Sequence, residues 1–145
     1  MLKHKIFAAA AVLVVLGGAC SDGEGAASST TAVAGSSDEV VFASGSLPET
    51  LPDTFPLPVG SSVGSTMVVS ATGFTEVIVR ISAEQGITTQ FFEQGLRQAG
   101  FEVDNSAAVA EGWTIEFNLD GTKGDIDITE PVEGISQAVV RYNLP

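Results

Sequence analysis

The sequence predicts an α+β fold, a two-layer sandwich in which one helix over residues 83–99 packs on a mainly antiparallel sheet. Three observations lead to this prediction. One segment repeats its apolar side chains at helical spacing, several segments alternate apolar and polar side chains, and turn residues separate them. The expected element order is ββαββββ, within a globular domain over residues 63–145.

Residues 1–19, which precede this domain, have the three parts of a secretory signal peptide. MLKHK carries positive charge, residues 6–16 are an unbroken apolar run, and the closing GGA is small. The apolar run is shorter than the roughly 20 residues that a membrane-spanning helix needs. The sequence therefore predicts an exported chain that loses residues 1–19.

Cys20 follows this leader directly and is the only cysteine of the chain. The stretch LGGACSD resembles a bacterial lipobox, with Gly17 at the position where the commonest form has leucine. In that family the thiol is acylated with a diacylglycerol group, and the cysteine becomes the N-terminus. The resemblance implies lipidation of Cys20 and attachment to the extracytoplasmic side of the cell membrane, because two or three acyl chains anchor a protein stably. The alternative is an ordinary signal peptide that happens to end before a cysteine.

Two linker segments are expected between Cys20 and the domain. Residues 20–46 are rich in Gly, Ala, Ser and Thr and predict a flexible tether. Residues 47–62 contain LPETLPDTFPLP, whose prolines favour a stiff, extended lead-in, with a proline-rich ligand for a partner as the alternative. The stretch also resembles the LPxTG sorting signal, but Leu51 and Phe55 stand where that signal needs glycine.

A β-hairpin is expected next, over residues 66–71 and 75–81. Val77, Val79 and Ile81 share one face, and a Thr-Gly pair supplies the turn.

The helix over residues 83–99 is indicated by five apolar side chains at helical spacing, namely Ile87, Phe91, Phe92, Leu96 and Ala99. Ser82 and Gln85 have the spacing of a capping box, and Gly100 supplies the C-terminal stop. Gly95 lies on the apolar stripe, where it predicts a close approach of helix to sheet. The alternative hypothesis is a ligand groove between helix and sheet near Phe92 and Gly95.

The strands after the helix are expected at residues 101–104, at 113–119, around 126–128 and at 135–142. The side chains expected to face the core from the first long hairpin are Trp113, Ile115, Phe117, Leu119, Ile126 and Ile128. Turn residues at 120–124 separate its strands, and the expected pairing joins Leu119 to Ile126 and Phe117 to Ile128.

Three stretches of the sequence then support a resemblance. FPLPVGSS, QAGFEV and WTIEFNLDGTKGDIDI are similar to small exported lipoprotein domains of high-GC bacteria. The similarity covers residues 52–144 and implies the α+β fold, but it carries no activity and no site.

Composition excludes several kinds of site. The one histidine, His4, belongs to the leader, so the remaining chain cannot build a Ser-His-Asp, Cys-His or His-ligated zinc site. No phosphate-binding glycine motif is present, and we expect no cofactor. After the leader, four basic side chains face 18 carboxylates, so nucleic acid is not an expected partner.

The acidic residues Asp120, Asp125 and Asp127 are expected on the outer face and turn of the hairpin, beside Glu116 and Asn118. A solvated acidic face explains them most simply. The alternative is a calcium site formed by the three aspartates, since Ca²⁺ takes six to eight oxygen ligands.

Three functions remain open at this point. The first is a non-enzymatic, membrane-anchored module that binds an unknown envelope protein or ligand. The second is a small-ligand carrier that uses the groove near Phe92 and Gly95. The third is an enzyme that uses paired carboxylates, which need a cleft between them.

Overall fold

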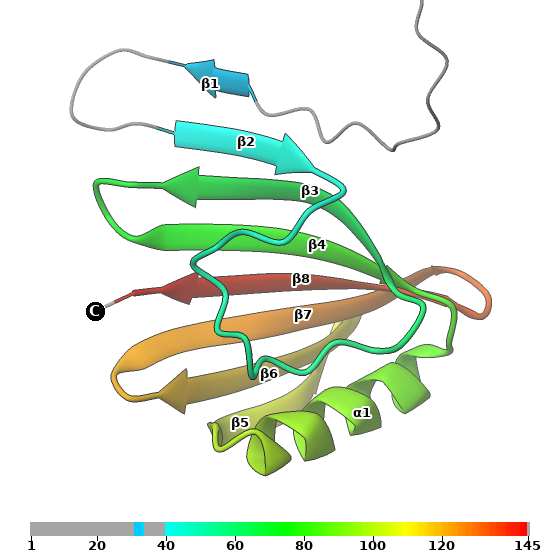
Figure 1. Cartoon of the computed structure of the whole chain (residues 1–145). Coiled ribbons are helices and arrows are strands. Elements are labelled where there is room, and N and C mark those ends of the chain that lie inside the picture. The colour runs from blue at the N-terminus through cyan, green and yellow to red at the C-terminus, as the bar shows by residue number, and fades with distance from the viewer. Residues whose placement is uncertain (1–30, 34–39, 145) are drawn as a thin grey trace, which may run out of the picture.

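A computed structural model describes residues 31–33 and 40–144 (Figure 1). The predicted signal peptide, Cys20 and most of the predicted tether lie outside these residues. The strands are β1 (Thr31–Val33), β2 (Val40–Ser44), β3 (Ser62–Val69), β4 (Phe74–Ile81), β5 (Glu102–Val109), β6 (Gly112–Leu119), β7 (Thr122–Val132) and β8 (Ile135–Asn143). The helix α1 (Gln85–Gln98) lies between β4 and β5 in the chain.

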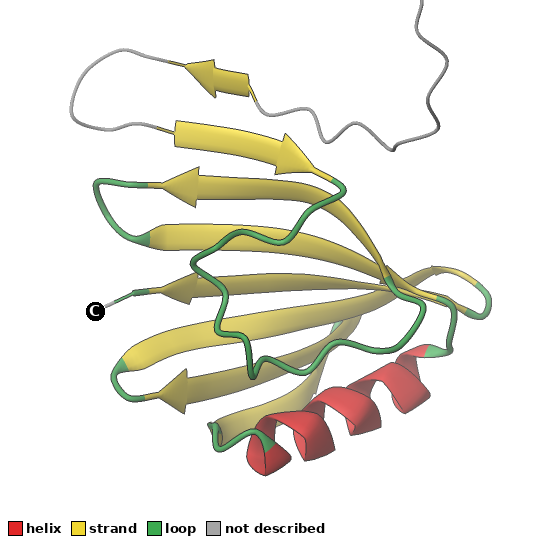
Figure 2. Cartoon of the chain, in the orientation of Figure 1, coloured by secondary structure: helices red, strands yellow, loops and turns green. Residues whose placement is uncertain are grey.

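All of these strands form one antiparallel sheet in the order β1-β2-β3-β4-β8-β7-β6-β5 (Figure 2). The sheet is open, with β1 and β5 at its edges. The strands β1 to β4 are neighbours in chain order, as are β5 to β8, and the two groups meet where β4 pairs with β8. The helix α1 connects β4, at this junction, to β5, at the edge of the sheet. The predicted α+β class, with one helix and a mainly antiparallel sheet, is confirmed.

The predicted order ββαββββ lacks two strands. β2 pairs with β3 from Val40 opposite Val69 to Ser44 opposite Ser65, and β1 pairs with β2. Both strands lie in the stretch that was expected to be tether. The physical reason is local: residues 40–42 read VVF, a short run of high β propensity that pairs once β3 offers a free edge.

The proline-rich stretch is part of the folded unit rather than a lead-in to it. Residues 45–61 cross the face of the sheet that α1 also covers (Figure 1). Leu51 and Phe55 are only 8% and 6% exposed, and the Phe55 ring centroid lies 5.8 Å from that of Phe117. The prolines shape this segment, but its apolar side chains decide where it goes, because burying each contributes about 1.5 to 3 kcal/mol.

A buried polar contact fixes the same segment to the sheet. The Thr50 hydroxyl shares hydrogen bonds of 3.1 Å with the Tyr142 hydroxyl and with the Thr75 hydroxyl. Tyr142 and Thr75 are 1% and 0% exposed. The segment therefore satisfies polar groups of β4 and β8 that would otherwise be buried without partners.

The core follows the predicted strand alternation. Its fully buried strand residues include Val77, Val79, Ile115, Phe117, Ile126, Ile128 and Val140. Trp113 and Leu119 face the same side but are half-buried at the margin of the core, because they lie near the two ends of β6. Trp113, which was expected in the core, therefore packs against its margin.

β6 and β7 pair as predicted, but the predicted register, Leu119 with Ile126 and Phe117 with Ile128, is wrong. Ile115 pairs with Ile126, and Trp113 with Ile128. The connection is a two-residue turn in which Asp120 has φ 50° and Gly121 has φ 90°, as the Asp-Gly signature of a tight hairpin predicts. The shift between the two registers is even, so the same side chains still reach the core.

The helix differs from the prediction at its start and on its apolar face. Its N-cap is Glu84, which makes no side-chain capping bond, so the Ser82–Gln85 capping box does not form. Its buried residues are Thr88, Thr89, Phe92 and Leu96, whereas Ile87 and Phe91 are 60% and 37% exposed.

The helix start is capped from the sheet instead. Glu130 of β7 accepts hydrogen bonds from the backbone N–H groups of Gln85 at 2.9 Å and Gly134 at 2.7 Å. These two bonds lower the pKa of the Glu130 carboxyl below its usual range. In the part of the chain that the structure describes, no helix has the length and apolar content to cross a membrane.

Candidate functional site

The helix is packed closely at Phe92 and Gly95, where a groove was the alternative prediction. Phe92 is 0% exposed and belongs to the core. A Cβ atom added at Gly95 would lie 2.7 Å from the Cβ of Pro56. Gly95 thus permits a close approach, but the partner is the proline-rich segment rather than the sheet. The predicted groove does not form at these two residues.

A groove between helix and sheet lies at the opposite end of α1. It has a volume of about 530 Å³, which is in the range of ligand pockets. The residues that line it come from α1, β5 and β6: Gln85, Gly86, Thr89, Gln90, Glu93, Ala108, Gly112 and Trp113. An ideal Cβ atom at Gly86 meets no atom within 4 Å, so the helix leaves open space here.

The indole of Trp113 is held in place in this groove by a chain of hydrogen bonds. Its Nε1–H donates to the Ser106 hydroxyl at 2.7 Å, and that hydroxyl donates to the Glu93 carboxylate at 2.5 Å. The chain links β6, β5 and α1. It orients the indole and engages one carboxylate oxygen of Glu93, which is the only charged side chain among the described residues that line the groove.

Thr89 supplies an unusual polar group to the same groove. The residue is 7% exposed, and its buried hydroxyl has no hydrogen-bond partner among the described residues. The neighbouring Thr88 hydroxyl is in the same condition within the core. A buried polar group without a partner costs about 1 to 3 kcal/mol, and Thr89 carries this cost at the groove.

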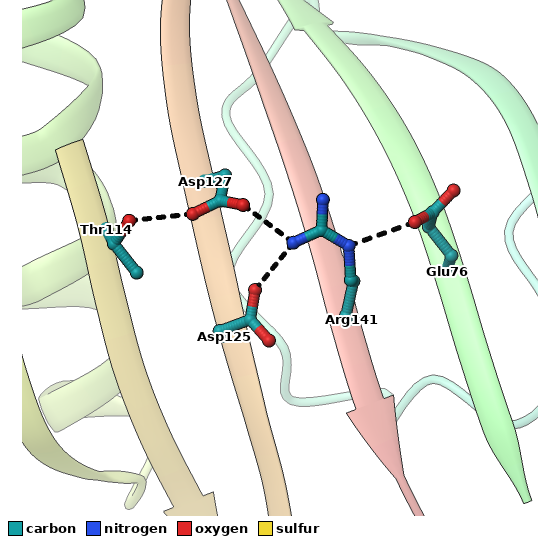
Figure 3. A network of polar contacts seen from close by, with 5 residues as sticks. All are labelled: Glu76, Thr114, Asp125, Asp127 and Arg141. Carbon is teal, nitrogen blue, oxygen red and sulfur yellow. Dashed lines mark hydrogen bonds and ion pairs between the residues drawn. The ribbon is translucent and has the colours of Figure 1, made fainter. Parts of the chain in front are cut away.

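A second polar cluster lies on the outer face of the sheet, around Arg141 of β8 (Figure 3). The Arg141 guanidinium donates to Glu76 at 3.0 Å, to Asp125 at 2.9 Å and to Asp127 at 2.6 Å. Thr114 donates to the other oxygen of Asp127 at 2.7 Å. The sheet register creates this cluster, because Arg141 lies opposite Glu76 on one side and Asp125 on the other.

The pKa values of the two aspartates in the cluster shift in opposite directions. Burial raises the pKa of the Asp125 carboxyl, with Arg141 opposing this change. Burial also acts to raise the pKa of Asp127, but hydrogen bonds from Arg141 and Thr114 outweigh it and lower that pKa. The hydrogen bond to Asp127 helps to raise the pKa of Arg141. These side chains are about one third exposed, so each ion pair contributes only about 0 to 1 kcal/mol.

The structure brings together two of the three aspartates proposed as calcium ligands. Asp125 and Asp127 converge on the Arg141 guanidinium, whereas Asp120 lies in the β6–β7 turn. Within residues 31–33 and 40–144, no group of three or more His, Cys, Asp or Glu side chains is placed to hold a metal ion. The cation that the two carboxylates contact is therefore a side chain of the protein.

Sequence reasoning missed the groove and the role of Arg141. Two signals were available: Gly86 in the first turn of a helix, where it lowers helix stability, and a single tryptophan on an edge-proximal strand. No signal in the sequence alone pairs Arg141 with Asp125, because this depends on which strands are neighbours.

The comparisons with known proteins give no further guide to this groove or to the Arg141 cluster. No protein-family model, no curated protein and no solved structure matches the chain.

Proposed function

We propose that this protein is an exported, lipid-anchored module that binds a partner or ligand at the cell envelope and catalyses no reaction. The observation that carries the proposal is Cys20, which directly follows a leader with the charge, apolar run and small residues of a signal peptide. In this proposal, an acylated Cys20 holds a two-layer domain at the extracytoplasmic face of the membrane.

The absence of catalysis is proposed on chemical grounds. After the leader, the chain has no histidine and no cysteine other than Cys20. Asp125 and Asp127, two carboxylates on the outer face, are both bound to the Arg141 guanidinium. Hydrogen bonds from Arg141 and Thr114 lower the pKa of Asp127, which makes this carboxylate a weaker general base.

A second candidate, a small-ligand carrier, is favoured by the groove at the start of α1. That groove combines an oriented indole with two glutamine side chains. Ligand sites commonly have this composition, with a few polar groups placed on a mixed surface.

The test compares the full-length chain with its Cys20→Ala variant in cells, each carrying a C-terminal tag. Mass spectrometry of the mature chain should find an acylated N-terminal Cys20 in the wild type, recovered with membranes, and an unanchored variant. Crosslinking in living cells should then recover a stoichiometric partner with the wild type alone. An unacylated Cys20 would overturn the anchor, and recovery of the protein without any partner would favour the carrier.

A further inference from the structure

We propose that the groove lined by Trp113, Thr89, Gln85, Gln90 and Glu93 binds a neutral saccharide. This inference rests on the proposed binding function and names the chemical class of its ligand. It does not depend on the lipid anchor, because the lining residues all lie within 85–113.

The charge of the lining selects against anions. Among the residues that the structure describes, no Lys, Arg or His lines the groove, and Glu93 adds a negative charge. The whole chain has a formal net charge of −12. A phosphate, a carboxylate or a nucleotide would therefore meet repulsion and no ion-pair partner.

The polar groups of the lining suit a ligand that carries several hydroxyl groups. The Gln85 and Gln90 amides each present both donors and an acceptor, as hydroxyl groups do. The Gln85 amide also donates to the Ile128 carbonyl at 3.4 Å, which limits its motion.

The indole supplies the apolar surface that the C–H face of a sugar ring needs. Trp113 is half-buried, and its bond to Ser106 holds it in one orientation, so little side-chain freedom is lost on binding. A purely apolar ligand fits less well, because it would cover the amides of Gln85 and Gln90 without offering them hydrogen bonds.

The experiment uses the purified full-length chain and two readouts. The first is an array of neutral and charged glycans. The second is tryptophan fluorescence, which reports on this groove alone because Trp113 is the only tryptophan of the chain. The soluble probes are maltose, cellobiose and N-acetylglucosamine, with glucose 6-phosphate and glucosamine as charged counterparts.

Two helix variants locate the binding. Gly86→Leu places a side chain at the groove, at a position where an added Cβ atom meets no described atom within 4 Å. Gln94→Leu adds a similar apolar side chain at an exposed position of α1 outside the groove. We expect at least about a tenfold rise in Kd for the first variant and no change for the second; tenfold corresponds to about 1.4 kcal/mol.

Each outcome decides the proposal. Binding of a neutral glycan that changes the fluorescence and is weakened by Gly86→Leu alone supports it. The absence of neutral glycans among the array hits, tighter binding of a charged counterpart, or unchanged binding by Gly86→Leu overturns it. Cys20 acylation and partner recovery are measured separately from glycan binding. A failure to bind glycans therefore leaves the anchored-module proposal standing, and an unacylated Cys20 leaves the saccharide proposal standing.

Discussion

The two glycines of α1 lie nine residues apart on one helix and mark opposite kinds of packing. Gly95 is closed over by Pro56, which comes within 2.7 Å of the position that its Cβ would take. Gly86 faces open space at the groove. The comparison teaches that a glycine in a helix does not by itself indicate close packing. Whether the space at its missing side chain is filled or left open depends on segments that are distant in the sequence.

The largest expected effect on stability comes from Phe55, in the proline-rich segment that packs against α1 at Gly95. Phe55→Ala should lower the free energy of unfolding by about 3 to 5 kcal/mol, because a buried aromatic ring leaves a cavity among Phe92, Phe101 and Phe117. Denaturant unfolding measures this loss. Val59→Ala, at a fully exposed position of the same segment, should change stability by less than about 0.5 kcal/mol. Equal effects for the two would mean that the segment does not belong to the core.

A smaller effect is expected from Gly95→Ala. The new methyl group must displace Pro56 or the helix, and such overpacking costs about 1 to 3 kcal/mol. Alanine returns up to about 1 kcal/mol through its helix propensity. The net result should be destabilisation of up to about 2 kcal/mol in denaturant unfolding. A stabilised variant would show that Pro56 moves freely and that this end is not closed.

The contrast between these ends also shows what the sequence could predict. The α+β class, the inward strand residues and the existence of α1 follow from periodicity, which is a local property. The groove does not, because it depends on which distant segments cover the helix. Pro56 covers Gly95 from 39 positions earlier in the chain, whereas no described atom lies within 4 Å of a Cβ placed at Gly86.

The same limit explains the individual errors. The expected capping box relied on Ser82 and Gln85, which are neighbours in sequence, whereas the structure caps the helix with Glu130 from β7. Ile87 and Phe91 fitted the helical period but point away from the core, because the sheet approaches α1 on the side of Thr88 and Phe92. Periodicity identifies an element, but its neighbours decide which face is buried.

At Gly86, a substitution by alanine is expected to change stability in the opposite direction from the same substitution at Gly95. Gly86→Ala should raise the free energy of unfolding by up to about 1 kcal/mol, because alanine favours the helix and its methyl group meets no atom within 4 Å. Thermal and denaturant unfolding measure the gain. If Gly86→Ala and Gly95→Ala shifted stability in the same direction, the distinction between the two ends of α1 would be wrong.

The smallest expected effect on stability comes from the charge of Glu130, which caps the start of α1. In the folded chain, hydrogen bonds from Gln85 and Gly134 lower the pKa of Glu130 below its ordinary value of 4.5. A lowered pKa means that the ionised carboxylate stabilises the fold above the unfolded pKa, and that this contribution is lost as the pH falls through the folded pKa. Glu130→Gln keeps an acceptor of similar size but removes the charge. We therefore expect the variant to be less stable than the wild type at pH 7 and the gap to close as the pH falls below about 4.5.

The control for this prediction is Glu133→Gln, an exposed acid in the same β7–β8 turn. Unfolding of both variants across pH 3 to 7 separates a specific cap from a general loss of negative charge. The chain is strongly acidic, so removing a negative charge by itself should reduce repulsion and stabilise the fold slightly. A loss of stability at pH 7 in Glu130→Gln but not in Glu133→Gln therefore requires the two backbone bonds, and it places the start of α1 under the control of β7. If both variants behaved alike, the helix start would be held by packing of Thr88 and Phe92, and the groove beside it would owe nothing to the cap.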